Sequence, residues 1–86
     1  MPLYLIERHF AERLQDQTPD SVRMVDDVNA DEGVRWVVSF LTADRLKSFC
    51  LYEATSPDAI WAAAERAGLP ADAIVEVDEF DPAAMR

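Results

Sequence analysis

The sequence predicts an α+β domain with a ferredoxin-like plait, in which a four-stranded antiparallel sheet carries two helices on one face. Three observations support this prediction. Residues 34–53 read as a β-hairpin rich in β-branched and aromatic residues, a capped helix start lies on each side of that hairpin, and strand-like segments occupy both ends of the domain. The element order is therefore β-α-β-β-α-β, and right-handed crossovers place both helices on the same face of the sheet.

The first half of the chain predicts a strand and then a helix. Residues 3–10 alternate bulky and polar side chains, as a half-buried strand does. Thr18, Pro19 and Asp20 start the helix, because a threonine can cap, proline suits the first turn and an acidic residue favours the helix dipole. Gly33 is the residue that ends this helix.

The central hairpin follows, with Ala43 and Asp44 as its predicted turn. Counting outward from that turn pairs Trp36 with Leu51. The second helix begins at Ser56-Pro57-Asp58 by the same capping argument, and it ends at Gly68-Leu69-Pro70. Residues 73–77 complete the sheet as the last strand.

Length and composition describe one small domain, with residues 1–86 as a single unit, a core of about residues 2–78, and an acidic tail at 79–86. Half of the residues are hydrophobic, which favours a packed core over disorder. A domain of this size hides only about 60–65% of its unfolded surface, so association with a second copy would stabilise it.

The charge excludes several classes of partner. The net charge is −9, with 17 acidic and 8 basic residues, and no basic patch exists that could bind nucleic acid or an anionic membrane. A single cysteine excludes a disulfide framework and a CxxC metal knuckle. The first ten residues do not read as a signal peptide, and no run approaches the ~20 apolar residues of a membrane span, so we expect a cytoplasmic protein.

The predicted plait leaves one face of the sheet uncovered. With the register above, the apolar and aromatic residues expected on this open face are Val37, Leu41, Leu46, Cys50 and Tyr52. An open face of this size needs a cover, and a second copy of the chain is the simplest one. We therefore expect a homodimer with facing sheets, of the dimeric α/β-barrel type.

Glu7 and His9 are the first candidates for a metal site. Residues two apart on a strand point to the same side, so the carboxylate and the imidazole can act together at the end of the first strand. Such ligands suit nickel, zinc or a similar divalent ion. Cys50 and Glu53 are second candidates; Cys50 can equally be a structural side chain or a nucleophile, and Glu53 can be a base or a solvated strand end.

A possible pocket is the other candidate site. Its candidate residues lie on the two hairpin strands: Trp36, Ser39, Cys50, Tyr52 and Glu53. An aromatic wall beside a carboxylate and a thiol is typical of a small-molecule site. Trp36 can also be an ordinary core residue.

Several segments together resemble a known family. They are LIERHF at the start, W-x-x-S at residues 36–39, FCLYEA at 49–54, S-P-x-A-I at 56–60 and AGLP at 67–70. In this order they resemble a ferredoxin-like family of small bacterial proteins, a domain of unknown function that is described as nickel-binding or nickel-responsive.

The resemblance implies the same fold, a homodimer and nickel binding. The family's acidic-x-His pair on the first strand matches Glu7 and His9, whereas the histidine that its better-studied branch carries in the second helix is absent from residues 60–64 here. The leading hypothesis is a non-catalytic dimeric binding protein for nickel or another divalent metal. The alternative is a small enzyme of the dimeric α/β-barrel type, an isomerase or cofactor-free oxygenase, with Glu53, Tyr52 or His9 as acid or base.

Overall fold

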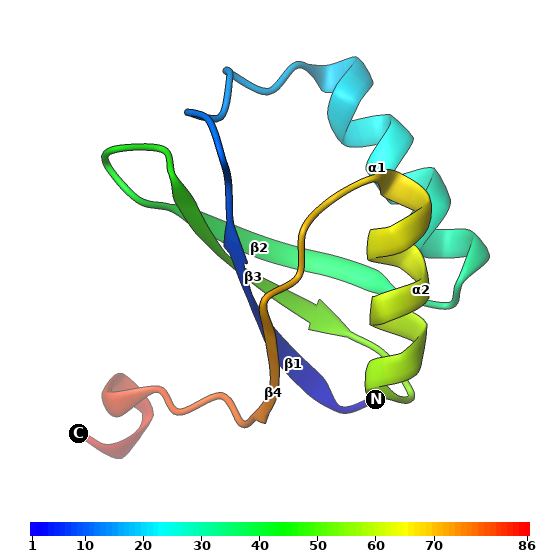
Figure 1. The fold of residues 1–86 in the computed structure, drawn as a ribbon. Coiled ribbons are helices and arrows are strands. Elements are labelled where there is room, and N and C mark those ends of the chain that lie inside the picture. The colour runs from blue at the N-terminus through cyan, green and yellow to red at the C-terminus, as the bar shows by residue number, and fades with distance from the viewer.

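The computed structural model describes residues 1–86 and has the predicted ferredoxin-like plait. Its elements are β1 (Leu3–His9), α1 (Pro19–Asp31), β2 (Arg35–Leu41), β3 (Lys47–Glu53), α2 (Pro57–Ala67), β4 (Ala73–Val77) and a short 3-10 helix, η1 (Pro82–Met85). The four strands form one antiparallel sheet in the order β2-β3-β1-β4. Both helices lie on the same side of this sheet, and the C-terminal segment extends away from the other elements (Figure 1).

The helix ends follow local capping chemistry. The Thr18 hydroxyl accepts a hydrogen bond from the Ser21 amide, while the Ser21 hydroxyl accepts one from the Thr18 amide, which completes a capping box. Ser56 begins α2 without any hydrogen bond from its side chain to the helix, unlike the predicted cap. Gly68 ends α2 in the left-handed region at φ 69°, where glycine carries no Cβ penalty.

The predicted register of the hairpin is wrong. Trp36 pairs with Tyr52 rather than with Leu51, and Ser39 pairs with Cys50. Cys50 and Tyr52 are consequently buried beneath the helices, at 5% and 2% exposure, instead of lying on the open face. A slip of one residue exchanges the two faces of a strand, so the faces predicted for β3 and for the part of β2 beyond Val37 are reversed, whereas Arg35 and Trp36 keep their predicted faces.

Two local features cause the shift. The loop is longer than a two-residue turn, since the Thr42 amide donates to the Lys47 carbonyl and Arg45 takes a positive φ of 61°. A β-bulge at Val37 adds one residue to β2 between its pairs with β3. Bulges of this kind bend a strand and change its pairing without any strong signal in the sequence.

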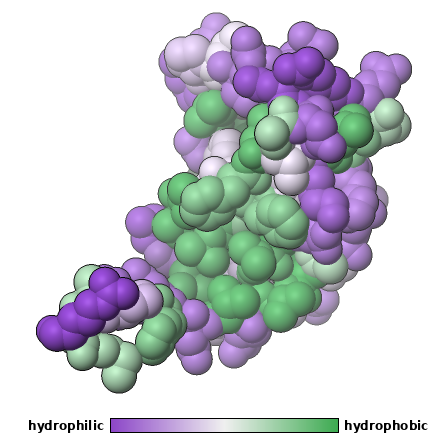
Figure 2. All heavy atoms as spheres, turned by 90° about the vertical axis from the view of Figure 1, so that its left-hand side faces the viewer, coloured by the Kyte–Doolittle hydropathy of each residue, from purple (hydrophilic) through white to green (hydrophobic).

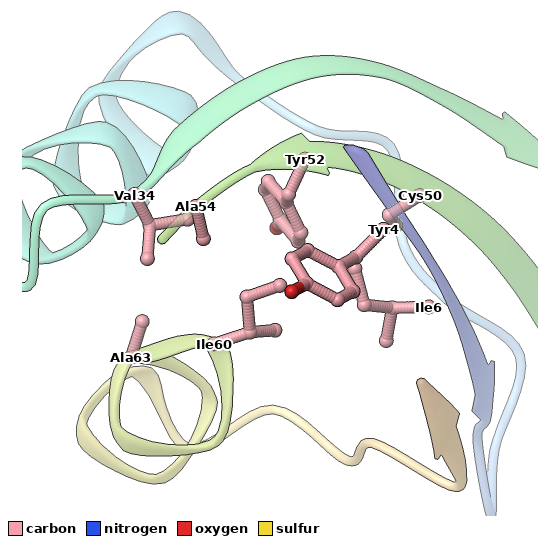
Figure 3. Close-up of a cluster of buried hydrophobic side chains, with 8 residues drawn as sticks. All are labelled: Tyr4, Ile6, Val34, Cys50, Tyr52, Ala54, Ile60 and Ala63. Atoms are coloured by element: carbon pink, nitrogen blue, oxygen red, sulfur yellow. The ribbon is translucent and has the colours of Figure 1, made fainter. Parts of the chain in front are cut away.

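The hydrophobic core lies between the sheet and α2. Ile60, Ala63 and Ala64 of α2 are buried, and Ile60 lies beside the aromatic rings of Tyr4 on β1 and Tyr52 on β3 (Figure 3). The buried cluster consists of Tyr4, Ile6, Val34, Cys50, Tyr52, Ala54, Ile60 and Ala63 (Figure 3). The two central strands, β1 and β3, contribute every second residue to this core, as the pleat requires.

The other face of the sheet has no helix over it and is strongly apolar. Figure 2 views this open face and shows a continuous hydrophobic area across the strands. The cross-strand pairs assign to it Leu3, Leu5, Val38, Phe40, Phe49, Leu51, Val75 and Val77. An uncovered apolar face is thus present as predicted, but its residues differ from the predicted ones because the register differs.

Candidate functional site

The open face carries the predicted Glu7–His9 pair at the end of β1. His9 Nε2 lies 3.2 Å from Glu7 Oε1, in agreement with the expectation that residues two apart on a strand share a side. The same carboxylate oxygen also receives the ammonium of Lys47 at 3.0 Å. The pKa of Glu7 is lowered from its ordinary value of 4.5, chiefly by the hydrogen bond from Lys47 and next by the one from His9.

These residues do not make a complete nickel site in one chain. No group of three or more His, Cys, Asp and Glu side chains comes close enough to hold a metal ion. The Lys47 ammonium competes for the Glu7 oxygen that a metal would need. Cys50 lies on the opposite face of the sheet, so it cannot join the pair. Two ligands with a competing cation therefore do not fit a firmly held divalent ion.

A pocket of about 120 Å³ lies on the helix side of the sheet, next to α1 and to the loop that joins β1 to α1. Its lining residues are Arg8, Phe10, Leu14, Gln17, Val25, Trp36, Ser39, Leu41, Ser48, Cys50, Tyr52 and Leu69. Four of the five candidate pocket residues are brought together here. The fifth, Glu53, lies on the opposite face, where it forms an ion pair with Arg35.

Polar contacts organise the wall of this pocket. The Trp36 indole Nε1 donates a hydrogen bond to the Ser39 hydroxyl at 2.7 Å. The bulge at Val37 places this donor and acceptor on the same side of β2, although they are three residues apart. Cys50 Sγ lies 3.6 Å from the Ser48 hydroxyl, and no imidazole lines the pocket. The thiol consequently lacks the base that a cysteine nucleophile requires.

Arg8 is the charged residue of the pocket, and it was not among the residues predicted to line it. It is only 3% exposed, and its guanidinium donates a 3.3 Å hydrogen bond to the hydroxyl of Tyr52. Burial raises the pKa of the Tyr52 hydroxyl, while the positive charge of Arg8 opposes that effect. The available signal was the alternation Tyr4-Ile6-Arg8, which puts the arginine in line with two core residues on β1.

The lining of the pocket contains neither a carboxylate nor an imidazole. Of the three acid–base candidates of the alternative hypothesis, Tyr52 lies in this lining, and Glu53 and His9 do not. It offers one guanidinium, three hydroxyl groups and one side-chain amide beside an aromatic and aliphatic surface. None of the helices has the length and apolar composition that crossing a membrane requires.

Comparisons with known proteins agree with this architecture. The crystal structure of SCO4226 from Streptomyces coelicolor A3(2) superposes with a TM-score of 0.69, covering 92% of this chain and 99% of that chain at 23% sequence identity. At this identity the similarity shows a shared fold. A search of curated proteins gives no match. Residues 4–77 match the sequence profile of the family described as "Nickel responsive protein SCO4226-like", which spans β1 to β4. The chain therefore belongs to the SCO4226-like family of nickel-responsive proteins.

Proposed function

We propose that this chain is a non-catalytic binding protein that works as a homodimer in the cytoplasm, with the open faces of two copies packed together. The open apolar face is the observation that carries the proposal. Phe40, Val75 and Val38 on this face are 64%, 56% and 40% exposed in a single copy. Contiguous apolar surface of this kind is rare on monomers and marks an interaction site. A cytoplasmic location is compatible with the free, buried thiol of Cys50.

The charges on the open face support pairing between two copies. Although the chain has a net charge of −9, the charged side chains on this face are matched in pairs. Lys47 binds Glu7, and Arg35 binds Glu53. Repulsion between two acidic molecules is therefore small where they would meet, and the apolar centre with a paired charged rim resembles a protein interface.

Sedimentation of wild type and of two single variants tests this proposal. Phe40→Glu puts a charge in the middle of the open face and should convert a dimer into a monomer at micromolar concentration. Met24→Glu is the matched control, because Met24 is 60% exposed on α1, on the helix side of the sheet, and should leave the dimer intact. A monomeric wild type, or a Phe40→Glu variant that remains a dimer, would reject the proposed interface.

Nickel binding is a second candidate function, supported by the family and by the Glu7–His9 pair. Since one chain presents only two ligands beside a competing ammonium, we confine this proposal to the homodimer. Facing sheets would bring a second Glu7–His9 pair to the same interface, and four ligands are enough for a divalent ion.

Equilibrium dialysis against nickel and zinc, followed by elemental analysis, tests the metal proposal on tag-free protein. Wild type should take up metal, and both His9→Ala and the monomeric Phe40→Glu variant should lose the uptake. Lys47→Met removes the competing ammonium and should strengthen binding. Equal uptake by wild type and His9→Ala would remove the assignment of the site.

A further inference from the structure

Arg8 is the only buried basic side chain, and no carboxylate pairs with it. None of the seven ion pairs in the structure includes this residue. Its hydrogen-bond acceptors are the neutral oxygens of Pro70 and Tyr52, and its guanidinium lies 5.8 Å from the centre of the Tyr52 ring. A buried charge without a counter-ion is unfavourable. A guanidinium has five N–H donors, and carboxylates are among its best acceptors.

A second buried donor lies nearby. The side-chain nitrogen Nδ2 of Asn29, in a residue that is 4% exposed, has no acceptor within hydrogen-bond distance, and the Tyr52 hydroxyl is the neighbouring polar group. Asn29 lines a narrow space that shares Arg8, Tyr52 and Leu69 with the 120 Å³ pocket. Unsatisfied buried donors are rare in proteins. The absence of a counter-ion for Arg8 is therefore the main indication that an anionic acceptor belongs in the pocket, and the Asn29 nitrogen lies in the adjoining narrow space.

The rest of the pocket is suited to an apolar molecule. The loop after β1 contributes Phe10 and Leu14, α1 contributes Val25, and the sheet contributes Trp36 and Leu41. The volume of about 120 Å³ is well above the roughly 10–15 Å³ that a cavity needs to hold one water molecule. A small organic molecule therefore fits the space better than a single ion does.

We propose that this pocket binds a small carboxylic acid with an apolar body. The carboxylate would accept hydrogen bonds from the Arg8 guanidinium, and the apolar body would lie against Trp36 and the side chains of the β1–α1 loop. This inference deepens the proposed binding function, because it names a class of ligand. It concerns the helix side of the sheet, away from the open face and from the Glu7–His9 pair, so it can fail without affecting the proposed dimer, and the reverse also holds.

Fluorescence titration provides the test, with benzoate and hexanoate as probes and benzamide as the neutral counterpart of benzoate. The protein has two tryptophans, so a Trp61→Phe background leaves Trp36 in the pocket wall as the reporter. We expect saturable changes with benzoate or hexanoate and little response to benzamide. Equal binding of benzoate and benzamide, or no binding of either carboxylate up to about 10 mM, would overturn the proposal.

Two variants locate the site. Arg8→Met keeps an unbranched apolar stem without the guanidinium and its charge, and should weaken carboxylate binding at least about tenfold, as expected for loss of a charge-assisted hydrogen bond. Val25→Phe fills the pocket from α1 and should abolish binding, whereas Val22→Phe, on the same helix but outside the lining, should not. Val25→Phe keeps the test decisive if Arg8→Met does not fold. Unchanged binding in a folded Arg8→Met or Val25→Phe variant would overturn the proposal.

Discussion

The hydrogen bond between Trp36 and Ser39 provides a test of how the pocket wall is built. The indole Nε1 donates to the Ser39 hydroxyl at 2.7 Å, and both residues line the pocket. Ser39→Ala removes the acceptor and leaves a half-buried indole N–H without its partner. The substitution should therefore destabilise the fold and loosen the position of the indole.

The expected magnitude follows from the neutral donor and acceptor and their partial burial. A hydrogen bond of this type contributes a net free energy of about 0.5–1.5 kcal/mol to folding. For a domain of this size, a loss of about 1 kcal/mol lowers Tm by about 4–8 °C. Ser39→Thr keeps a hydroxyl on a residue that favours strands, and it should retain most of the stability.

A double-mutant cycle with Trp36→Phe isolates this interaction, because the phenyl ring keeps much of the packing and lacks the donor. Urea unfolding of wild type, both single variants and the double variant should be measured at one protein concentration, since the proposed dimerisation would make apparent stability depend on concentration. A coupling free energy near 1 kcal/mol is expected. Additivity of the two substitutions within about 0.3 kcal/mol would refute the structural role of this hydrogen bond.

Three further predictions concern the core, the ion pair and the helix cap. Ile60 is 1% exposed and Trp61 is 45% exposed, so Ile60→Ala should cost about 2–5 kcal/mol in urea unfolding and more than Trp61→Ala, although the tryptophan is larger. The lowered pKa of Glu7 means that its contribution to stability is present above its unfolded pKa, near the ordinary 4.5, and is lost as pH falls through the lower folded pKa. Glu7→Gln should thus lose more stability at pH 7 than at pH 3, whereas Glu65→Gln, exposed and outside every ion pair, should show no such difference. Thr18→Ala should cost about 1 kcal/mol in thermal unfolding, because it removes a capping box; an unchanged Tm would reject that role.

The order of the elements could be read from the sequence because the responsible signals are local. Thr18 and Pro19 start α1 through contacts within a single turn, and Gly68 ends α2 because its backbone alone favours the left-handed conformation. Alternation along β1 correctly predicted that Glu7 and His9 lie side by side. These features depend on neighbours a few residues apart, which the sequence displays directly.

The faces of the hairpin could not be read in the same way. One extra residue at Val37 and a longer loop between β2 and β3 change the pairing, and each side chain of β3 then takes the face opposite to the predicted one. Neither feature carries a distinctive composition. For this reason Glu53 lies away from the pocket, while Cys50 lies within its lining.

The sequence by itself determined the fold class, the existence of an uncovered sheet face and the Glu7–His9 pair, since all three follow from local patterns and from the handedness of chain crossovers. Only the tertiary structure decided which side chains share a face, that the Glu7 carboxylate is also held by Lys47, and that Arg8 lies buried without a counter-ion beside a pocket. The last two of these facts depend on contacts between residues that are 40 or more positions apart, Glu7 with Lys47 and Arg8 with Tyr52, and neither segment alone shows how favourable such a contact is.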